Sequence, residues 1–169
     1  MQLYLLRHAI AVPRGTAGYQ HDAQRPLTDE GHAQAREVAA GLKRLKLEIE
    51  AMVTSPYLRA VQTAQEAASV LGMRAPIQEL AELRAEANPR DTSLALKRFM
   101  AHDRLLLVGH EPHLSAWIAE LVAGRGGMRC LMKKAGVACV EVDEVPPSSG
   151  RGTLRWLMTP KQLTLVGAP

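Results

Sequence analysis

Short apolar runs alternate with segments of helical periodicity along the chain. The runs 3–6 and 105–108 are apolar throughout, a pattern typical of parallel strands that are covered on both faces. After Thr28, a residue suited to capping a helix, apolar side chains recur at helical spacing, at Ala35, Val38, Ala39, Leu42 and Leu45. This alternation of strand and helix predicts an α/β sandwich around a mainly parallel sheet.

The same pattern predicts the remaining elements. Further strands are expected at 51–54 and 76–80, and a last pair at 137–142 and 153–158, joined by a Pro-Pro-Ser-Ser-Gly stretch that suits an antiparallel pair. A second helix is expected to open at Ser55-Pro56, with Ser55 as its cap, and to stop at Gly72. Two more helices are predicted, one at 91–101 and one that Pro112 starts.

The composition is that of an ordinary globular protein. The 169 residues are 47% hydrophobic and 22% charged, which suits one domain spanning residues 1–169. No apolar run is long enough to span a bilayer, and the N-terminus lacks the apolar stretch of a signal peptide. A cytoplasmic protein without a membrane partner is therefore expected. Cys130 and Cys139 form neither a CxxC pair nor a zinc-ligand set, and we expect reduced thiols.

The charge favours anionic partners in general. The net charge is +4, but the basic residues form no run longer than two, and aromatic residues make up only 4% of the chain. A nucleic-acid partner is therefore not expected, because neither a phosphate-binding stripe nor a base-stacking platform is present in the sequence.

Arginine and histidine residues follow three of the predicted strands. Arg7 and His8 follow the first strand, Arg59 lies shortly after the second, and His110 follows the strand at 105–108. Ligands of open α/β sheets bind outside the carboxyl ends of the strands. These four side chains are therefore expected to meet at one edge of the sheet.

Two histidines and two arginines suit a doubly charged anion. Guanidinium groups present forks of donors that match the geometry of phosphate. A neutral imidazole can attack phosphorus and become phosphorylated, while the remaining cations stabilise the charge of the transferring group. These residues predict phosphoryl transfer for which neither a metal ion nor another cofactor is required.

Four motifs in this order resemble those of the histidine phosphatase superfamily. They read LLRHA at 5–9, RPLTDEG at 25–31, SPYLRAVQTA at 55–64 and VGHEP at 108–112. The small size, the RPLT segment and the ending WLMTPKQL at 156–163 are most similar to the SixA-type phosphohistidine phosphatase branch. The resemblance implies a three-layer α/β/α sandwich of the phosphoglycerate mutase-like type.

The resemblance also implies roles for individual residues. His8 matches the phosphorylated nucleophile, and Arg7 and Arg59 match arginines that bind the phosphoryl group. His110 matches a second histidine that contacts the phosphoryl oxygens and stays protonated, and Arg25 is expected at the mouth of the pocket. His113, by contrast, is expected at the rim or in solvent.

Two departures from the family pattern bear on the substrate. Ala9 stands where many members have glycine, next to the nucleophile. Larger members have an acid after the third strand, whereas here Glu82 and Glu86 are the candidates and neither lies in a clear acid motif. Because an imidazole leaves phosphorus with less help from an acid than an alkoxide does, a phosphohistidine-bearing protein is the expected substrate. Glu86 is assigned to substrate binding. A small-molecule phosphomonoesterase and a phosphate-binding module without catalysis remain the alternatives.

Overall fold

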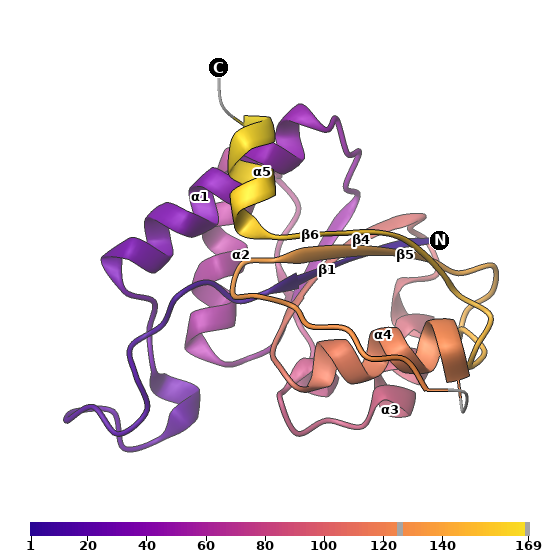
Figure 1. Ribbon diagram of the computed structural model, residues 1–169, viewed down its shortest axis with the longest axis horizontal. Helices are drawn as coiled ribbons and strands as arrows, with labels where there is room; N and C mark the ends of the chain where they lie inside the picture. Colours follow the sequence, from indigo (N-terminus) through magenta and orange to yellow (C-terminus); the bar gives the residue numbers. More distant parts are fainter. Residues whose placement is uncertain (125–126, 168–169) are drawn as a thin grey trace.

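The computed structural model describes residues 1–124 and 127–167, and it confirms an α/β/α sandwich built on one mixed sheet (Figure 1). The sheet order is β3-β2-β4-β1-β5-β6, in which β1 to β4 pair in parallel and β5 pairs antiparallel with both β1 and β6. The strands are β1 (Gln2–Arg7), β2 (Ala51–Thr54), β3 (Gln78–Glu79), β4 (Arg104–Gly109), β5 (Val137–Glu141) and β6 (Thr153–Met158).

Helices cover both faces of this sheet (Figure 1). One layer holds α1 (Asp29–Arg44), α2 (Leu58–Leu71) and α5 (Pro160–Gly167), and the other holds α3 (Pro89–Ala95) and α4 (His113–Ala123). Short 3-10 turns are η1 (Asp22–Gln24), η2 (Ala81–Leu83) and η3 (Leu96–Phe99). No helix in residues 1–124 and 127–167 is both long and apolar enough to cross a membrane.

The central strands divide their side chains between two cores. Leu3 and Leu5 of β1 pack into the layer of α3 and α4, around Trp117. Tyr4 and Leu6 point to the opposite face and pack into the layer of α1, α2 and α5. Burial on both faces is the physical reason for the continuous apolar run at the start of the chain.

Most predicted elements are confirmed, with shifted boundaries. Thr28 caps α1 by accepting a hydrogen bond from the backbone N–H of Gly31, and Gly72 ends α2 with a left-handed φ of 73°. The strand expected at 76–80 shrinks to β3, and the helix expected at 91–101 starts earlier, as α3, and ends in η3. The pair β5 and β6 is antiparallel, as its turn indicated.

Two local predictions are wrong. The second helix begins at Leu58 rather than at Ser55-Pro56, and its cap is Tyr57. The Ser55 hydroxyl accepts a long hydrogen bond, 3.4 Å, from the backbone N–H of Tyr57 and has a closer partner elsewhere. The sequence analysis also missed α5. This helix packs on α1 so closely that a Cβ at Gly41 would lie 2.2 Å from the backbone oxygen of Leu163, so glycine is needed at that position.

The sheet brings the predicted site residues to one edge. In β1 and β4, Arg7 pairs with Gly109, and the next residue, His8, donates its backbone N–H to the Gly109 carbonyl at 3.0 Å. Ser55, after β2, donates its N–H to the Val108 carbonyl at 2.9 Å. The residues that follow β1, β2 and β4 are thus adjacent although they lie about 50 positions apart in the sequence.

Candidate active site

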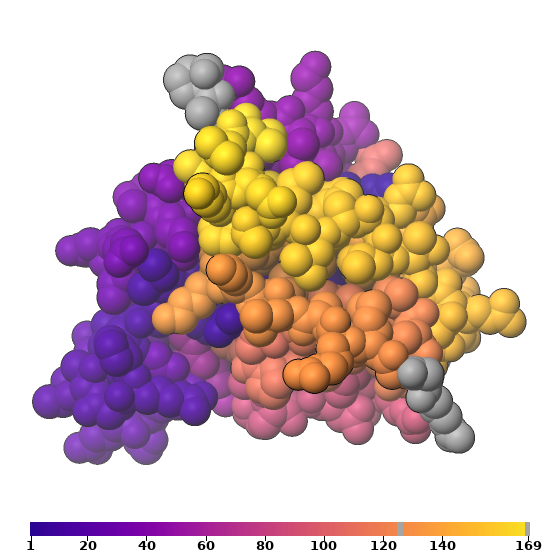
Figure 2. Space-filling model, in the orientation of Figure 1, coloured from indigo at the N-terminus to yellow at the C-terminus, as the bar shows by residue number. Residues whose placement is uncertain are grey.

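A cavity of about 310 Å³ lies at this edge of the sheet, and it brings together the four residues expected to perform catalysis. In the space-filling view, the indigo N-terminal segment and the orange segment that precedes β5 meet in this region (Figure 2). The residues that line the cavity are Arg7, His8, Ala11, Pro13, Arg14, Arg25, Arg59, His110, Glu111 and Lys134. Five of these are arginine or lysine, so the cavity is strongly cationic, as a doubly charged anion requires.

The tautomer of His8 is fixed by the backbone. Its Nδ1 lies 2.7 Å from the carbonyl oxygen of Ala9, and because a carbonyl can only accept, Nδ1 carries the proton. The other ring nitrogen, Nε2, is therefore unprotonated, and its lone pair accepts a hydrogen bond from Nε of Arg59 at 3.3 Å. The methyl group of Ala9 packs in the core beneath α1 and α2, so alanine next to His8 fits without obstructing the cavity.

Every nitrogen of the Arg59 guanidinium has a partner. Besides the bond to His8, Nη1 donates to the backbone oxygen of Asp22 at 2.7 Å and Nη2 donates to its carboxylate Oδ2 at 2.9 Å. The side chain is 2% exposed and lies in the first turn of α2. Arg59 is thus held in one orientation, with its charge directed at the nucleophilic nitrogen.

Asp22 joins three arginines, a role that the sequence analysis did not assign. Its Oδ1 accepts from Nε of Arg14 at 2.9 Å and from Nε of Arg25 at 2.9 Å, while Oδ2 accepts from Arg59. Burial alone would raise the pKa of Asp22, but the bond from Arg25 and the charges of the three arginines lower it to about 2. Arg25 is 8% exposed and lines the cavity, as its expected place at the pocket mouth requires.

Arg7 is anchored from the opposite side. Its Nη1 donates to the carbonyl oxygen of Met132 at 2.7 Å, in the segment before β5. Burial lowers its pKa, although the nearby carboxylate of Glu111 acts in the other direction. Its Nε is buried and has no hydrogen-bond partner among the residues that the structure describes. A buried donor without a partner is costly, and an anion in the cavity would satisfy it.

His110 lies beside His8, with ring centroids 5.0 Å apart. Its Nε2 is hydrogen-bonded to the hydroxyl of Ser55 at 2.8 Å, and its Nδ1 is buried with no partner in residues 1–124 and 127–167. Burial and the positive neighbours lower the pKa of His110 to about 2, so it is neutral near pH 7 among the chain's own groups. Burial is the main cause, and the positive charge of Arg59 adds to it. That His110 is protonated stays a prediction for the state in which a phosphoryl group is bound.

Ser55 is a site residue that sequence reasoning missed. It was interpreted as a helix cap, yet its hydroxyl fixes the ring of His110. Glu111, Arg14 and Lys134 were missed as well, although they line the cavity. Lys134 belongs to a basic pair visible in the sequence, but its place depends on the path of the segment before β5, which no local pattern indicates.

His113 is not at the rim. It is 2% exposed, and its Nε2 is hydrogen-bonded to the Thr92 hydroxyl at 2.8 Å. That hydroxyl also donates to the carbonyl of Glu82 at 2.6 Å, so His113 connects α4 to the segment of η2 and α3. The expectation of a solvated side chain is wrong, because α4 turns this residue into the core rather than toward the cavity.

The two candidate acids after β3 do not line the His8 cavity. Glu86 accepts a hydrogen bond from the Tyr57 hydroxyl at 2.7 Å and lines a neighbouring cavity of about 430 Å³. Glu82 lines a third cavity, farther along the same segment. Glu111 is the acidic residue that lines the His8 cavity, and its Oε1 accepts a hydrogen bond from the Ser115 hydroxyl at 2.8 Å.

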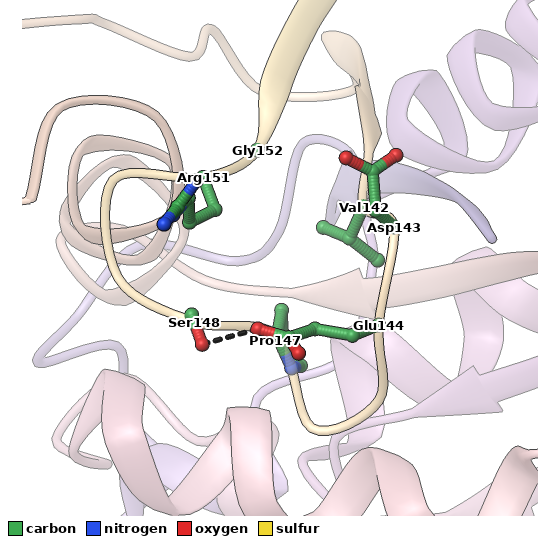
Figure 3. A pocket seen from close by; sticks show the side chains of 7 residues that line it. All are labelled: Val142, Asp143, Glu144, Pro147, Ser148, Arg151 and Gly152. Carbon is green, nitrogen blue, oxygen red and sulfur yellow. Dashed lines mark hydrogen bonds between the residues drawn. The ribbon is translucent and has the colours of Figure 1, made fainter.

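A cavity of about 450 Å³ lies in the loop between β5 and β6, at the opposite end of β1 (Figure 3). It is lined by Val142, Asp143, Glu144, Pro147, Ser148, Arg151 and Gly152, and the Ser148 hydroxyl donates to Glu144 within it. It contains one cation against two carboxylates and no histidine, so it lacks the groups for binding a phosphoryl dianion. Across residues 1–124 and 127–167, three or more His, Cys, Asp or Glu side chains nowhere gather as a metal site would require.

The three buried histidines predict an acid-sensitive fold. Burial lowers the pKa of His8 to about 3, of His110 to about 2 and of His113 to about 4, against 6.5 in an unfolded chain. Below pH 6.5 the unfolded state therefore binds more protons than the folded state, and stability is lost as the pH falls toward the folded pKa values. Each histidine contributes at most about 1.4 kcal/mol per pH unit.

Urea unfolding at pH 7, 6 and 5 measures this effect. The free energy of unfolding is expected to decrease at each step, and His113→Gln, which removes a titrating group outside the cavity, should make the decrease shallower. A free energy of unfolding that stays constant from pH 7 to pH 5 would contradict the burial of neutral histidines.

Sequence and structure comparisons agree on one family. The profile of the histidine phosphatase superfamily (branch 1) matches residues 3–88. The phosphohistidine phosphatase SixA of Escherichia coli K12 is 31% identical over 170 aligned residues, with 99% of each chain covered. An uncharacterized protein of Picosynechococcus sp. is 40% identical over 141 residues, covering 81% of this chain and 82% of its own.

Solved structures give the same result. A structure of the protein histidine phosphatase SixA with tungstate superposes with a TM-score of 0.83 at 31% identity, covering 96% of this chain and 99% of that one. The α-ribazole phosphatase of Shigella flexneri shares the fold, with a TM-score of 0.67 at 20% identity over 95% of this chain and 97% of its own.

Proposed function

Because the chain belongs to the histidine phosphatase superfamily, we propose that it hydrolyses phosphohistidine on a protein substrate through a covalent phospho-His8 intermediate. The observation that carries the proposal is the state of His8. Its Nε2 is unprotonated at the wall of a cationic cavity, because Nδ1 carries the proton that bonds to Ala9. The 3.3 Å bond that Nε2 accepts from Arg59 breaks when Nε2 attacks phosphorus, which leaves that N–H for a phosphoryl oxygen. A neutral imidazole so oriented is a nucleophile for phosphorus.

The reaction consists of two displacements at phosphorus. The Nε2 lone pair of His8 attacks the phosphoryl group, the bond between phosphorus and the substrate imidazole breaks, and its electron pair returns to the leaving nitrogen. Water then attacks phospho-His8, and the electron pair of that P–N bond returns to Nε2 as inorganic phosphate forms. Arg7 and Arg59 stabilise the charge on the equatorial oxygens in both steps.

A phosphoryl dianion also completes the hydrogen bonds of the site. It would supply acceptors to the unpartnered Nε of Arg7 and to a protonated Nδ1 of His110. A bound dianion raises the pKa of a neighbouring imidazole, so His110 would gain its proton with substrate and stabilise the transferring group. The tungstate in the similar SixA structure is a tetrahedral oxyanion, which supports an anion site of this kind.

Phosphohistidine is favoured over unactivated esters as the substrate, because its leaving group, an imidazole, needs no proton donor in the cavity. Neither Glu82 nor Glu86 lines the His8 cavity, and Glu111 is held as an acceptor by Ser115. An imidazole that is protonated on its remote nitrogen leaves as a neutral ring, whereas an alkoxide needs an acid that contributes about 10²- to 10⁴-fold. The name of the full-length relative, phosphohistidine phosphatase SixA, supports the same substrate.

A second candidate function is a small-molecule phosphomonoesterase. The observation that favours it is Glu111, a carboxyl group in the wall of the His8 cavity that would serve as proton donor if Ser115 released it. No third function is favoured by the geometry.

A substrate panel separates the two functions. We expect kcat/KM on a phosphohistidine-bearing carrier protein to exceed that on an unactivated sugar phosphate by at least about 100-fold, the low end of what a general acid supplies. Release of inorganic phosphate measures both reactions under the same conditions. Comparable kcat/KM values on the two substrates would favour the phosphomonoesterase, and Glu111→Gln should then abolish ester hydrolysis.

A further inference from the structure

A second cavity adjoins the His8 cavity, and the two share the walls formed by Arg14 and Arg25. The second cavity measures about 430 Å³ and is lined by Arg14, Gly15, Tyr19, Gln20, Asp22, Arg25, Tyr57, Ala85 and Glu86. A group attached to a phosphoryl in the first cavity therefore has an adjoining space of suitable size for a ring.

Tyr57 forms the partition between the two cavities. Its ring centroid is 5.0 Å from that of His110 and 5.1 Å from Cζ of Arg59, both residues of the His8 cavity. Its hydroxyl reaches Glu86 in the second cavity at 2.7 Å. That bond raises the pKa of Tyr57, so the phenol is the donor and the Glu86 carboxylate the acceptor.

The carboxylate of Glu86 retains capacity for a further donor. A carboxylate offers about four acceptor positions, and among the described residues the Tyr57 hydroxyl is the hydrogen-bond partner of this side chain. The arginines of the same cavity, Arg14 and Arg25, are already paired with Asp22. The negative charge of Glu86 is therefore not neutralised by an ion pair inside the cavity.

We propose that this second cavity binds the leaving imidazole of phosphohistidine, with Glu86 accepting a hydrogen bond from the ring N–H remote from phosphorus and Tyr57 flanking the ring. The proposal rests on the proposed function. It adds the residue, Glu86, that would distinguish a leaving imidazole from other leaving groups. When the P–N bond breaks, its electron pair returns to the near nitrogen, the remote nitrogen keeps its proton, and neutral imidazole departs. Glu86 favours the protonated ring that this step needs, without transferring a proton itself.

Two small substrates test the proposal. Phosphoimidazole carries the ring N–H when protonated, whereas p-nitrophenyl phosphate presents a leaving group without any N–H. Glu86→Ala is expected to lower kcat/KM on phosphoimidazole about 10-fold, as for loss of a hydrogen bond to a charged acceptor, and to change kcat/KM on p-nitrophenyl phosphate less than 2-fold. Glu79→Ala is the matched control, because Glu79 is an exposed acid on β3 that lines neither cavity.

Each outcome decides one point. An equal loss on both substrates, or no loss on phosphoimidazole, would overturn the leaving-group site while leaving phospho-His8 chemistry in place. Wild-type protein that hydrolyses p-nitrophenyl phosphate but not phosphoimidazole would overturn the proposed function itself. Tyr57→Phe keeps the ring and removes the hydroxyl that bonds to Glu86. A 10-fold loss on phosphoimidazole in Tyr57→Phe, together with wild-type kcat/KM in Glu86→Ala, would show that the tyrosine hydroxyl, not Glu86, serves the leaving group.

Discussion

Replacing His8 with alanine is expected to lower kcat/KM by at least about 10³-fold and to eliminate the phosphorylated intermediate, because His8 supplies the only histidine lone pair that Arg59 positions at the cavity wall among the described residues. The neighbouring ring of His110 is not expected to substitute for it, since the Arg59 guanidinium bonds to His8 and Asp22 and directs no N–H at His110. Incubation with a labelled phosphodonor, followed by a rapid quench, should show acid-labile, base-stable label on the wild-type chain and none on the variant.

The control for this experiment is His102→Gln. His102 lies outside the cavity, 4.0 Å from Glu50 at the other end of the sheet, so its replacement should leave label and turnover unchanged. Label that persists in His8→Ala, or label in the wild type that is stable to acid, would place the covalent chemistry on another residue and exclude phospho-His8.

The low pKa of His8 has a consequence for this intermediate. Burial, and then the charges of Arg59 and Arg7, lower the pKa of His8 to about 3. The proposed nucleophile is therefore neutral across the physiological range, and no base has to remove a proton from its Nε2. A free histidine with a pKa near 6.5 would lose its nucleophilic form below that pH. The same burial makes the fold sensitive to acid. Once the pH is low enough to protonate His8 in the unfolded chain but not in the folded one, the free energy of unfolding decreases.

The parts of the fold that the sequence predicts are those with a local physical cause. The buried strand at 105–108 is evident because burial on both faces demands apolar residues at every position, and Thr28 and Gly72 act through their own backbone geometry. The cluster of candidate site residues could be predicted as well, since parallel strands end at the same edge whatever their exact bounds. His8, Arg59 and His110 therefore meet as expected.

The parts that could not be predicted depend on long-range packing. Ser55 and Asp22 each suit a local role, in a cap or a turn. The contact of Ser55 with His110 depends on the pairing of β2 with β4, and the contact of Asp22 with Arg59 depends on the packing of η1 against α2. His113 follows the same rule, because the rotation of α4 on the sheet decides whether it faces the cavity or the core. The helical spacing of Leu114, Trp117, Ile118 and Leu121 is the signal that could have placed His113 on the buried face, since it lies one turn before Trp117.

Arg59→Lys is expected to lower kcat/KM by about 10² to 10³-fold, even though the positive charge is kept. The guanidinium makes three directed bonds at once, to Nε2 of His8 and to the backbone and carboxylate oxygens of Asp22. A lysine ammonium is a point charge on a flexible chain and cannot reproduce that fork. The loss should fall mainly on kcat, because orientation toward the transferring phosphoryl matters most in the transition state.

Steady-state kinetics with a phosphohistidine substrate, together with thermal unfolding, separates this effect from a folding defect. Arg155→Lys on β6 is the matched control, since this exposed arginine pairs with Glu141 and lies outside the cavity. Asp22→Asn refines the test, because it keeps the backbone oxygen that accepts from Arg59 but removes the carboxylate. The kcat of this variant should lie between the kcat of the wild type and that of Arg59→Lys. Equal kcat values for Arg59→Lys and the wild type would contradict this prediction. They would mean that positive charge alone, without the guanidinium geometry that Asp22 orients, stabilises the transferring phosphoryl group.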